Sequence, residues 1–350
     1  MKPALTSLER VLTTLGRREP DRVPLFLLLS LHGAQELGMG IREYFSAARH
    51  VVDGQARLRT RYGHDCYDAF FYAAIEMEAW GGEARFFDDG PPNAGAPIVS
   101  HAAQIAGLAV PDVAECARLR QVLDAIAGLH EKAAGEVPVI GVVMSPYSLP
   151  VMQLGFERYL DWQTEAPEAI ERLWRMNQEF CVEWANAQLK AGATAICYFD
   201  PLASPTITPP AEYRRTGWRI ARQTLARIAG PTATHLASGR SLPAIDLLAQ
   251  TGTVAVGVSA LEDLAEVKHA CAGRMAVIGN LDGIAMRRWT EAEAEAEVKA
   301  AIAQGAPGGG FILSDNHGEI PWQVSSDTLM AIAEAVRRWG EYPLFGRDGR

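Results

Sequence analysis

The sequence contains little cysteine, and its cysteines are scattered. Its 350 residues include five of them, an odd number, and no two form a C-x-x-C pair. Such scattered cysteines are typical of reduced thiols, not of a disulfide framework or a zinc knuckle. The five positions are Cys66, Cys116, Cys181, Cys197 and Cys271.

Long apolar runs and basic clusters are also missing. No segment approaches a run of about 18 uncharged apolar residues, the length that a membrane-spanning helix needs. Residues Met1–Arg10 carry charges where a signal peptide has an apolar stretch. We therefore expect a cytoplasmic protein. The formal net charge is −9 and the basic residues form no stripe, which argues against nucleic-acid binding.

Eight short apolar runs are present instead, and each is typical of a buried strand. Hydrophobic residues make up 48% of the chain, enough for a sizeable core. The predicted strands are Val23–Leu29, Tyr67–Ala73, Pro138–Met144, Thr194–Phe199, Thr232–Leu236, Thr253–Val258, Met275–Gly279 and Gly310–Leu313.

Helical patterns alternate with most of these strands. They cover Ile41–Tyr62, Phe156–Lys190, Ala211–Ile228, Leu242–Ala249, Glu262–Ala270, Thr290–Gln304 and Ser325–Trp339. Strands that alternate with helices indicate βαβ units and a parallel sheet. Eight such units predict an α/β fold, a single (β/α)₈ TIM barrel in one domain over residues 1–350.

Two local signals refine this prediction. Thr290 and Glu293 have the spacing of a capping box at a helix start, and Gly305 follows the expected end of that helix, where a left-handed cap residue is common. The region Glu76–Pro111 is rich in glycine, proline and aspartate. We expect an irregular excursion there, after the second strand.

Polar residues follow almost every predicted strand. Active sites of barrels form at the carboxyl ends of the strands, so these residues are the candidates for chemistry. In chain order they are Ser30 and His32; Tyr72, Glu76 and Glu78; Ser145 and Tyr147; Asp200; His235 and Ser238; Ser259; Asn280 and Asp282; and Asp315 and His317.

His235 and His317 form the most informative pair. Two histidines at strand ends, with carboxylates nearby, have the composition of a metal site with an open position. One structural histidine and one metal-free general acid or base would give the same pattern. No local spacing such as H-x-x-x-H favours the metal, so both interpretations remain open from the residues alone.

Several longer segments resemble the uroporphyrinogen decarboxylase superfamily, and within it the corrinoid-dependent methyltransferases of the methylcobamide:coenzyme M type. The resemblance runs nearly from end to end and implies a (β/α)₈ barrel. The matching segments are Ser7–Val11, Glu19–Pro24, Glu76–Gly81, Asp88–Pro92, Asp200–Pro205, Gly279–Asp282 and Gly308–Ser314.

The methyltransferase resemblance implies a zinc site built from a His-x-Cys pair and a distant cysteine. His235 matches the histidine, but Ala237 stands at the first cysteine position and His317 at the second. These exchanges leave either a site of two imidazoles and a carboxylate or no metal at all.

The resemblance also separates two activities. Uroporphyrinogen decarboxylases carry an arginine-rich segment after the first strand, which holds the acidic arms of the tetrapyrrole. Ser30–Gln35 contains no arginine here, and guanidinium groups are the residues of choice for binding carboxylates. We therefore rank decarboxylation of that substrate second.

The resemblance thus implies an enzyme that moves a methyl group between a small methylated compound or acceptor and a corrinoid. A separate protein would carry this cobalamin, because the sequence has no Asp-x-His-x-x-Gly signature. The expected metal ligands are His235 and His317, the catalytic residues Asp200, Glu78, His32 and Tyr147, and the cofactor-binding residues Ser145, Asn280 and Ser238. The alternatives are a metal-free decarboxylase, with Asp200 or a histidine protonating the carbanion, and a catalytically silent subunit.

Overall fold

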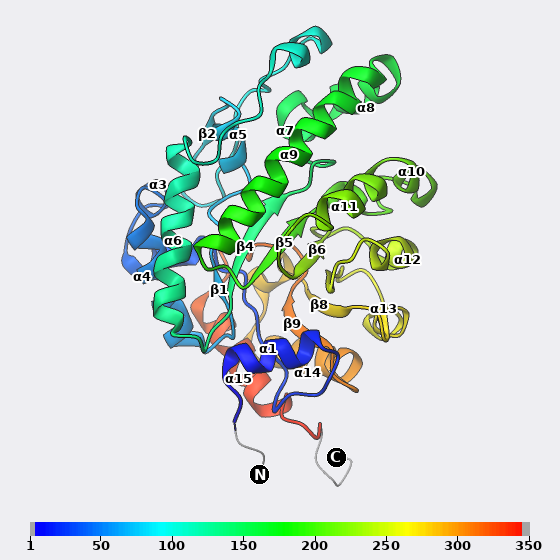
Figure 1. Ribbon diagram of the computed structural model, residues 1–350. Helices are drawn as coiled ribbons and strands as arrows, with labels where there is room; N and C mark the ends of the chain where they lie inside the picture. Colours follow the sequence, from blue (N-terminus) through cyan, green and yellow to red (C-terminus); the bar gives the residue numbers. More distant parts are fainter. Residues whose placement is uncertain (1–3, 345–350) are drawn as a thin grey trace.

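A curled parallel sheet forms the centre of the molecule (Figure 1). The computed structural model describes residues 4–344; the predicted domain also includes residues 1–3 and 345–350, which lie outside the described residues. Neighbours in the sheet follow the chain order β1-β4-β5-β6-β7-β8-β9, with parallel pairing throughout. The strands are β1 (Tyr67–Asp68), β4 (Val139–Met144), β5 (Ala195–Phe199), β6 (Thr232–His235), β7 (Ala255–Gly257), β8 (Ala276–Leu281) and β9 (Phe311–Asp315).

The eighth barrel position is occupied by the extended segment Val23–Leu29, which was predicted as a regular strand. Leu25 forms a single parallel bridge with Leu313 of β9, and the Asp65 amide donates to the Leu25 carbonyl at 2.7 Å on the other side. Pro24 has no amide hydrogen, and the Leu25 amide donates to the Asp65 carboxylate at 2.9 Å. A continuous ladder cannot form for these reasons, so the TIM-barrel fold is confirmed with seven regular strands.

Helices surround the sheet on its outer side (Figure 1). They are α1 (Ser7–Leu15), α2 (His32–Leu37), α3 (Ile41–Tyr44), α4 (Ala48–Tyr62), α5 (Ile75–Ala79), α6 (Ala117–Ala133), α7 (Pro150–Leu154), α8 (Phe156–Glu165), α9 (Pro167–Ala191), α10 (Pro210–Arg215), α11 (Gly217–Leu225), α12 (Ile245–Ala249), α13 (Leu264–Cys271), α14 (Glu291–Gly305) and α15 (Ser326–Trp339). The 3₁₀ turns are η1 (Ala102–Gly107), η2 (Pro201–Ala203), η3 (Leu242–Ala244) and η4 (Ala285–Arg288).

Three predicted helices are each two helices in the structure. The predicted Ile41–Tyr62 divides into α3 and α4, Phe156–Lys190 into α8 and α9, and Ala211–Ile228 into α10 and α11. In the second case Pro167 begins the new helix, since proline fits the first turn but not a helix interior.

In helix α14 the predicted capping box at the N-terminus is confirmed, whereas the predicted left-handed cap at Gly305 is wrong. Thr290 and Glu293 form the capping box. Gly305 does not adopt a left-handed conformation; it is the last helical residue, before Ala306. A Cβ at Gly305 would lie 2.7 Å from the Phe311 ring, so glycine here allows β9 to approach the helix closely.

The excursion after the second predicted strand is present and ordered. It contains α5, an antiparallel hairpin of β2 (Ala84–Arg85) and β3 (Asn93–Ala94), and η1. Gln323 Nε2 donates to the Asp89 carbonyl at 2.8 Å. This contact links the hairpin loop to the segment that follows β9.

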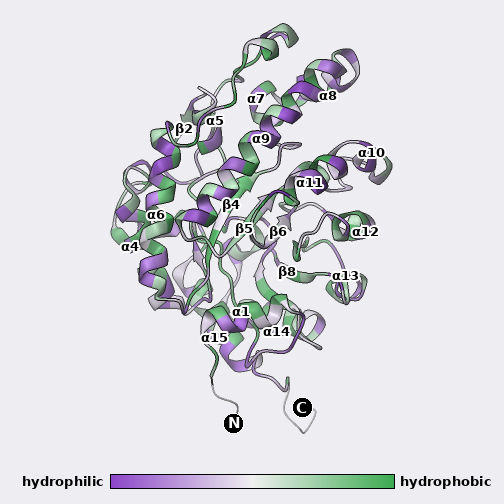
Figure 2. Cartoon of the chain, viewed as in Figure 1, coloured by the Kyte–Doolittle hydropathy of each residue, from purple (hydrophilic) through white to green (hydrophobic). Residues whose placement is uncertain are grey.

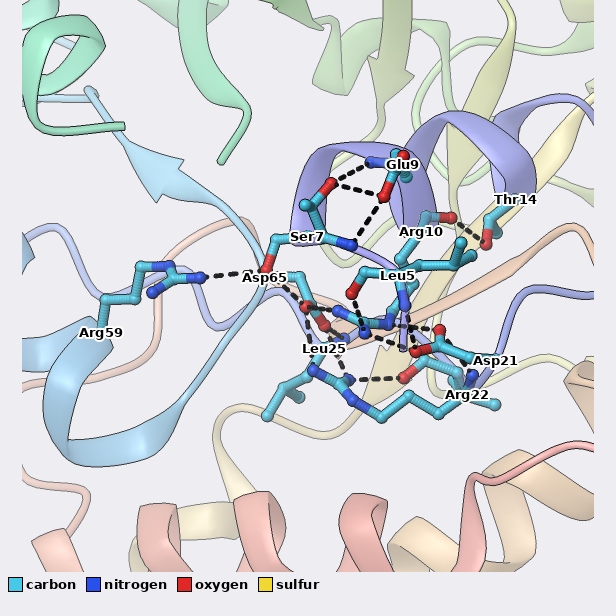
Figure 3. A network of polar contacts seen from close by, with 12 residues as sticks. Leu5, Ser7, Glu9, Arg10, Thr14, Asp21, Arg22, Leu25, Arg59 and Asp65 are labelled. Carbon is cyan, nitrogen blue, oxygen red and sulfur yellow. Dashed lines mark hydrogen bonds and ion pairs between the residues drawn. The ribbon is translucent and has the colours of Figure 1, made fainter. Parts of the chain in front are cut away.

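A buried ion network centred on Asp65 holds α1 against the barrel (Figure 3). The Asp65 carboxylate pairs with Arg10 at 2.7 Å and with Arg22 at 2.8 Å, and Ser7 Oγ donates to it at 2.9 Å. Arg10 also pairs with Asp21 at 2.7 Å. The network therefore fixes α1 to the extended segment Val23–Leu29, which we call the closing segment.

The core lies between the sheet and the helices. Figure 2 shows hydrophobic colouring on strands such as β8 and both kinds of colouring along the outer helices, as expected for helices that bury one face. Under α1, Val11 packs with Phe26 and Ile312 beside an apolar cavity of about 70 Å³. No helix within residues 4–344 combines the length and apolar character needed to cross a membrane.

Candidate active site

A cavity of about 190 Å³ lies at the carboxyl ends of the strands. Residues from the barrel form its floor and walls, and Pro91, Pro92 and Asn93 of the hairpin form another side. The other lining residues are Leu28, Asp68, Phe70, Ala73, Ile140, Val142, Cys197, Phe199, His235, His317, Gly318 and Glu319.

Asp68 ends β1 and is 1% exposed. Its Oδ1 accepts the Phe70 amide at 3.0 Å, whereas its Oδ2 has no hydrogen-bond partner among the described residues. Burial, together with the nearby charge of Asp315, raises the pKa of the Asp68 carboxyl to about 7. This carboxyl can therefore be either protonated or ionised near neutral pH.

Two further acidic groups lie near Asp68. Ser30 donates a hydrogen bond to Glu319 Oε1, and burial raises the pKa of Glu319 to about 8, with added effects of Asp68 and Asp315. Asp315 Oδ2 accepts the amides of His317 at 2.8 Å and Gly318 at 2.9 Å. Burial raises the pKa of Asp315 to about 6.

His235 and His317 line the same cavity, as their positions at strand ends predicted. The His235 ring stacks on Phe199, with centroids 5.5 Å apart. A Cβ at Gly257 would lie 2.4 Å from His235 Cδ2, so glycine in β7 makes room for the ring. Burial lowers the pKa of His235 to about 4, and burial also lowers the pKa of His317. Both imidazoles are therefore neutral at pH 7.

The side chains around these imidazoles do not assemble the implied zinc site. Within residues 4–344, no three His, Cys, Asp or Glu side chains are grouped so that they could hold a metal ion. The Ala237 amide donates to His235 Nδ1 at 3.1 Å, and Ser238 Oγ contacts His317 Nδ1 at 2.5 Å. Since Nδ1 of the neutral His235 ring accepts the hydrogen bond from Ala237, its proton lies on Nε2 and neither nitrogen has a free lone pair. Ala237 supplies no ligand, so the donor set does not fit zinc.

Asp200, Ser145 and Tyr147 belong to a separate buried cluster. Asp200 Oδ1 accepts the hydroxyls of Ser145 and Ser148, both at 2.6 Å, and burial raises the Asp200 pKa to about 6. The Tyr147 hydroxyl accepts from Thr216 at 3.2 Å. Since these residues lie outside the cavity lining, catalytic roles for Asp200 and Tyr147 and cofactor binding by Ser145 stay predictions.

The remaining predicted residues are dispersed around the barrel mouth. Glu78 accepts the Tyr72 hydroxyl at 2.7 Å and pairs with Arg118 at 3.1 Å. His32 begins α2 and is 2% exposed, and the centroid of its ring lies 6.4 Å from that of the Trp322 ring. Asn280 donates to the Ser259 carbonyl at 3.2 Å and lines a different groove, beside Asp282 and Trp289. Their predicted roles are not tested by these contacts.

Asp68 and Glu319 are site residues that the sequence patterns did not predict. The apolar run Tyr67–Ala73 predicts one long strand, whereas β1 has only two residues and ends at Asp68. The signal was a lone carboxylate inside an apolar run. Glu319 follows the Ser-Asp-Asn-His-Gly segment, and its distance from the strand end concealed it.

The cavity lining contains acidic side chains without a basic counterpart. Across the described part of the chain, neither arginine nor lysine lines it, whereas Asp68 and Glu319 do. Buried charges in proteins are normally paired. The cavity is therefore suited to a neutral or cationic ligand.

Comparison with known proteins finds relatives that carry the names of two different activities. It is 28% identical over 361 residues to a uroporphyrinogen decarboxylase of Xylella fastidiosa, covering 94% of this chain and 98% of the relative. It is also 28% identical over 212 residues to the methylcobamide:CoM methyltransferase MtaA of Methanosarcina barkeri, covering 59% of this chain and 62% of the relative.

A solved structure described as a methyltransferase from Methanosarcina mazei superimposes with a TM-score of 0.86. It covers 95% of this chain and 99% of its own, and its sequence identity of 21% makes this a likeness of fold. The sequence model for uroporphyrinogen decarboxylase (URO-D) matches residues 6–339. The chain therefore belongs to the uroporphyrinogen decarboxylase (URO-D) family.

Proposed function

We propose that this protein is a methyltransferase that moves a methyl group between a small methylated compound and a corrinoid carried by a separate protein. The observation that carries the proposal is the acidic, partly aromatic cavity at the barrel mouth, which is lined by Asp68, Glu319 and two neutral imidazoles. The partial similarity to MtaA supports the same reaction type.

The cavity is unsuited to a substrate with many carboxylates. A polycarboxylate would place its negative charges beside two acidic side chains, Asp68 and Glu319, whereas arginine and lysine are missing from the lining formed by residues 4–344. The carboxylates of the substrate would have no cationic partner there, and ionised Asp68 would repel them. This favours methyl transfer over decarboxylation of a tetrapyrrole.

Methyl transfer requires that the heteroatom of the donor accept an electron pair as its bond to the methyl group breaks. Positive charge on the heteroatom assists this step. Asp68 and Glu319, with pKa values raised to about 7 and 8, can hold protons beside the donor at neutral pH. Zinc would polarise the heteroatom in the same way, but the donor set does not fit it, so no step here relies on a metal.

His235 and the aromatic rings orient the donor. His235 is held by its stacking on Phe199 and by the Ala237 amide. His317 is held by Ser238. Immobilised groups of this kind lower the entropic cost of aligning the methyl group with an incoming nucleophile.

The test is a transfer assay with purified protein. Cob(I)alamin is mixed with a panel of small methyl donors, and the absorbance of methylcobalamin is followed; protein-free mixtures are the control. We expect methylcobalamin to form only with the protein and a subset of donors. Failure with every donor, together with production of coproporphyrinogen from uroporphyrinogen, would overturn the proposal.

Decarboxylation is the second candidate, because a full-length relative carries the uroporphyrinogen decarboxylase name. In that reaction a proton must reach the carbanion left by carbon dioxide. Protonated Asp68 or Glu319 could supply it. The same assay, run with uroporphyrinogen in parallel, separates the two functions.

A further inference from the structure

We propose that the methyl donor bound in this cavity is a small methylated onium cation, a quaternary ammonium or a sulfonium. The inference rests on the proposed methyl transfer and specifies its substrate class. Three independent features carry it: uncompensated carboxyl groups, aromatic walls and, within residues 4–344, no group of side chains suited to hold a metal ion.

The first feature is the unpaired acidic charge. Asp68 is 1% exposed and lines the cavity, and its Oδ2 has no hydrogen-bond partner within residues 4–344. Asp315 Oδ1, just outside the lining, also has no hydrogen-bond partner in the described chain, while Glu319 is held by Ser30. A buried carboxylate that lacks a cationic partner in the protein acquires one when a cation binds.

The second feature is the nature of the walls. Phe70 and Phe199 line the cavity together with Pro91 and Pro92. Aromatic faces attract quaternary ammonium groups, which present methyl groups and a diffuse positive charge. An onium methyl group needs apolar contact around it and a carboxylate nearby. The lining supplies both.

The third feature is the lack, among residues 4–344, of side chains grouped to hold a metal ion. A neutral ether or alcohol leaves poorly unless a metal or a proton activates its oxygen. An onium nitrogen or sulfur already carries the positive charge, so it needs neither a metal nor a proton from Asp68 or Glu319. When its bond to methyl breaks, the bonding electron pair stays on the heteroatom and a neutral amine or sulfide leaves. The corrinoid nucleophile supplies the electron pair of the new cobalt–carbon bond, so charge and atoms balance without zinc.

Ala237 and His317 are consistent with this chemistry. Ala237 has no ligating side chain and His317 is held by Ser238, and within the described residues no three His, Cys, Asp or Glu side chains are grouped to hold a metal ion. A substrate that brings its own activation removes the need for those ligands. The acidic lining then serves to bind the charge of the substrate.

Calorimetric titration of the full-length protein tests the inference without any corrinoid. The probes are choline and its neutral carbon analogue 3,3-dimethylbutan-1-ol, with trimethylsulfonium as a second onium arm that shows whether nitrogen or sulfur is preferred. We expect at least one onium to bind about tenfold or more tightly than the neutral analogue, a difference of about 1.4 kcal/mol. Equal affinity of the neutral analogue and both cations would overturn the inference.

Two variants locate the effect. Asp68→Asn should weaken binding of the cation about tenfold or more. Glu76→Gln is the matched control, because Glu76 is also buried, has a pKa raised to about 8 by burial, and accepts the Met144 amide outside the cavity. Cation binding unchanged in a folded Asp68→Asn protein would contradict the site. If the Asp68→Asn protein does not fold, the inference is still tested by comparing the affinities of wild-type protein for the cation and for the neutral analogue.

This outcome is separable from that of the proposed function. Methyl transfer from neutral donors with no preference for an onium would refute the inference and leave the methyltransferase standing. Onium binding by Asp68 supports the inference directly, since it is measured in the absence of transfer.

Discussion

The buried network at Asp65 makes a quantitative prediction about stability. Its carboxylate is fully buried and pairs with Arg10 and Arg22, whose side chains are 7% and 21% exposed. Asp65→Asn keeps the shape but removes the charge. Breaking a buried pair by losing one partner costs about 3–5 kcal/mol. We expect the lower end, about 3 kcal/mol, because Arg10 retains Asp21 at 2.7 Å.

This loss in the free energy of unfolding can be expressed as a change in the melting temperature, Tm. Unfolding entropy near 60 °C is about 2.1 cal/mol/K per residue, or about 0.7 kcal/mol/K for a chain of this length. A loss of about 3 kcal/mol therefore lowers Tm by about 4 °C. Differential scanning calorimetry measures it. The control is Asp246→Asn, because Asp246 is 82% exposed and its pair with Arg274 should contribute about 0–1 kcal/mol. Equal shifts in both variants would refute this account of the network.

Three further predictions follow from single positions and from the cavity. Gly305→Ala places a Cβ against Phe311 and should cost about 1–3 kcal/mol; an unchanged Tm would show that β9 can move away. Burial raises the Glu319 pKa from 4.5 to about 8, so the folded state holds a proton that the unfolded state releases. Tm should therefore fall as pH rises from 5 toward 8 and fall less in Glu319→Gln; identical slopes would contradict the assigned burial. Uroporphyrinogen should give a kcat well below about 1 s⁻¹, and chromatographic detection of coproporphyrinogen at a higher rate would reverse the ranking of activities.

The sequence predicted the barrel because its physical signals are local. Parallel strands are buried on both faces and read as continuous apolar runs. The closing segment Val23–Leu29 departed from that pattern because Asp65, distant in sequence, accepts the Leu25 amide. Gly305 was misassigned for a similar reason, since its neighbour Phe311 becomes apparent only in three dimensions.

The candidate site was predictable to a smaller extent. His235 and His317 lie together as their strand ends indicated, because the carboxyl ends of barrel strands meet at one face. The grouping of Asp68 with Glu319 depends on where β1 ends and how the chain turns after β9. Asp200 followed a strand as expected, but Ser145 and Ser148 hold its carboxyl away from the cavity. Strand position therefore identified the face and its two histidines, but not the acidic members of the site.

The most direct test of the central claim is a single-turnover assay of methyl transfer with three proteins. Wild type, Asp68→Asn and Glu76→Gln are each mixed with cob(I)alamin and, in separate reactions, tetramethylammonium or methoxybenzene, and methylcobalamin absorbance is followed. We predict transfer by wild type and Glu76→Gln and a loss of about 100-fold or more in Asp68→Asn. Equal rates in all three proteins, or no transfer by wild type from these two donors and from the wider donor panel, would contradict the claim that this cavity performs methyl transfer.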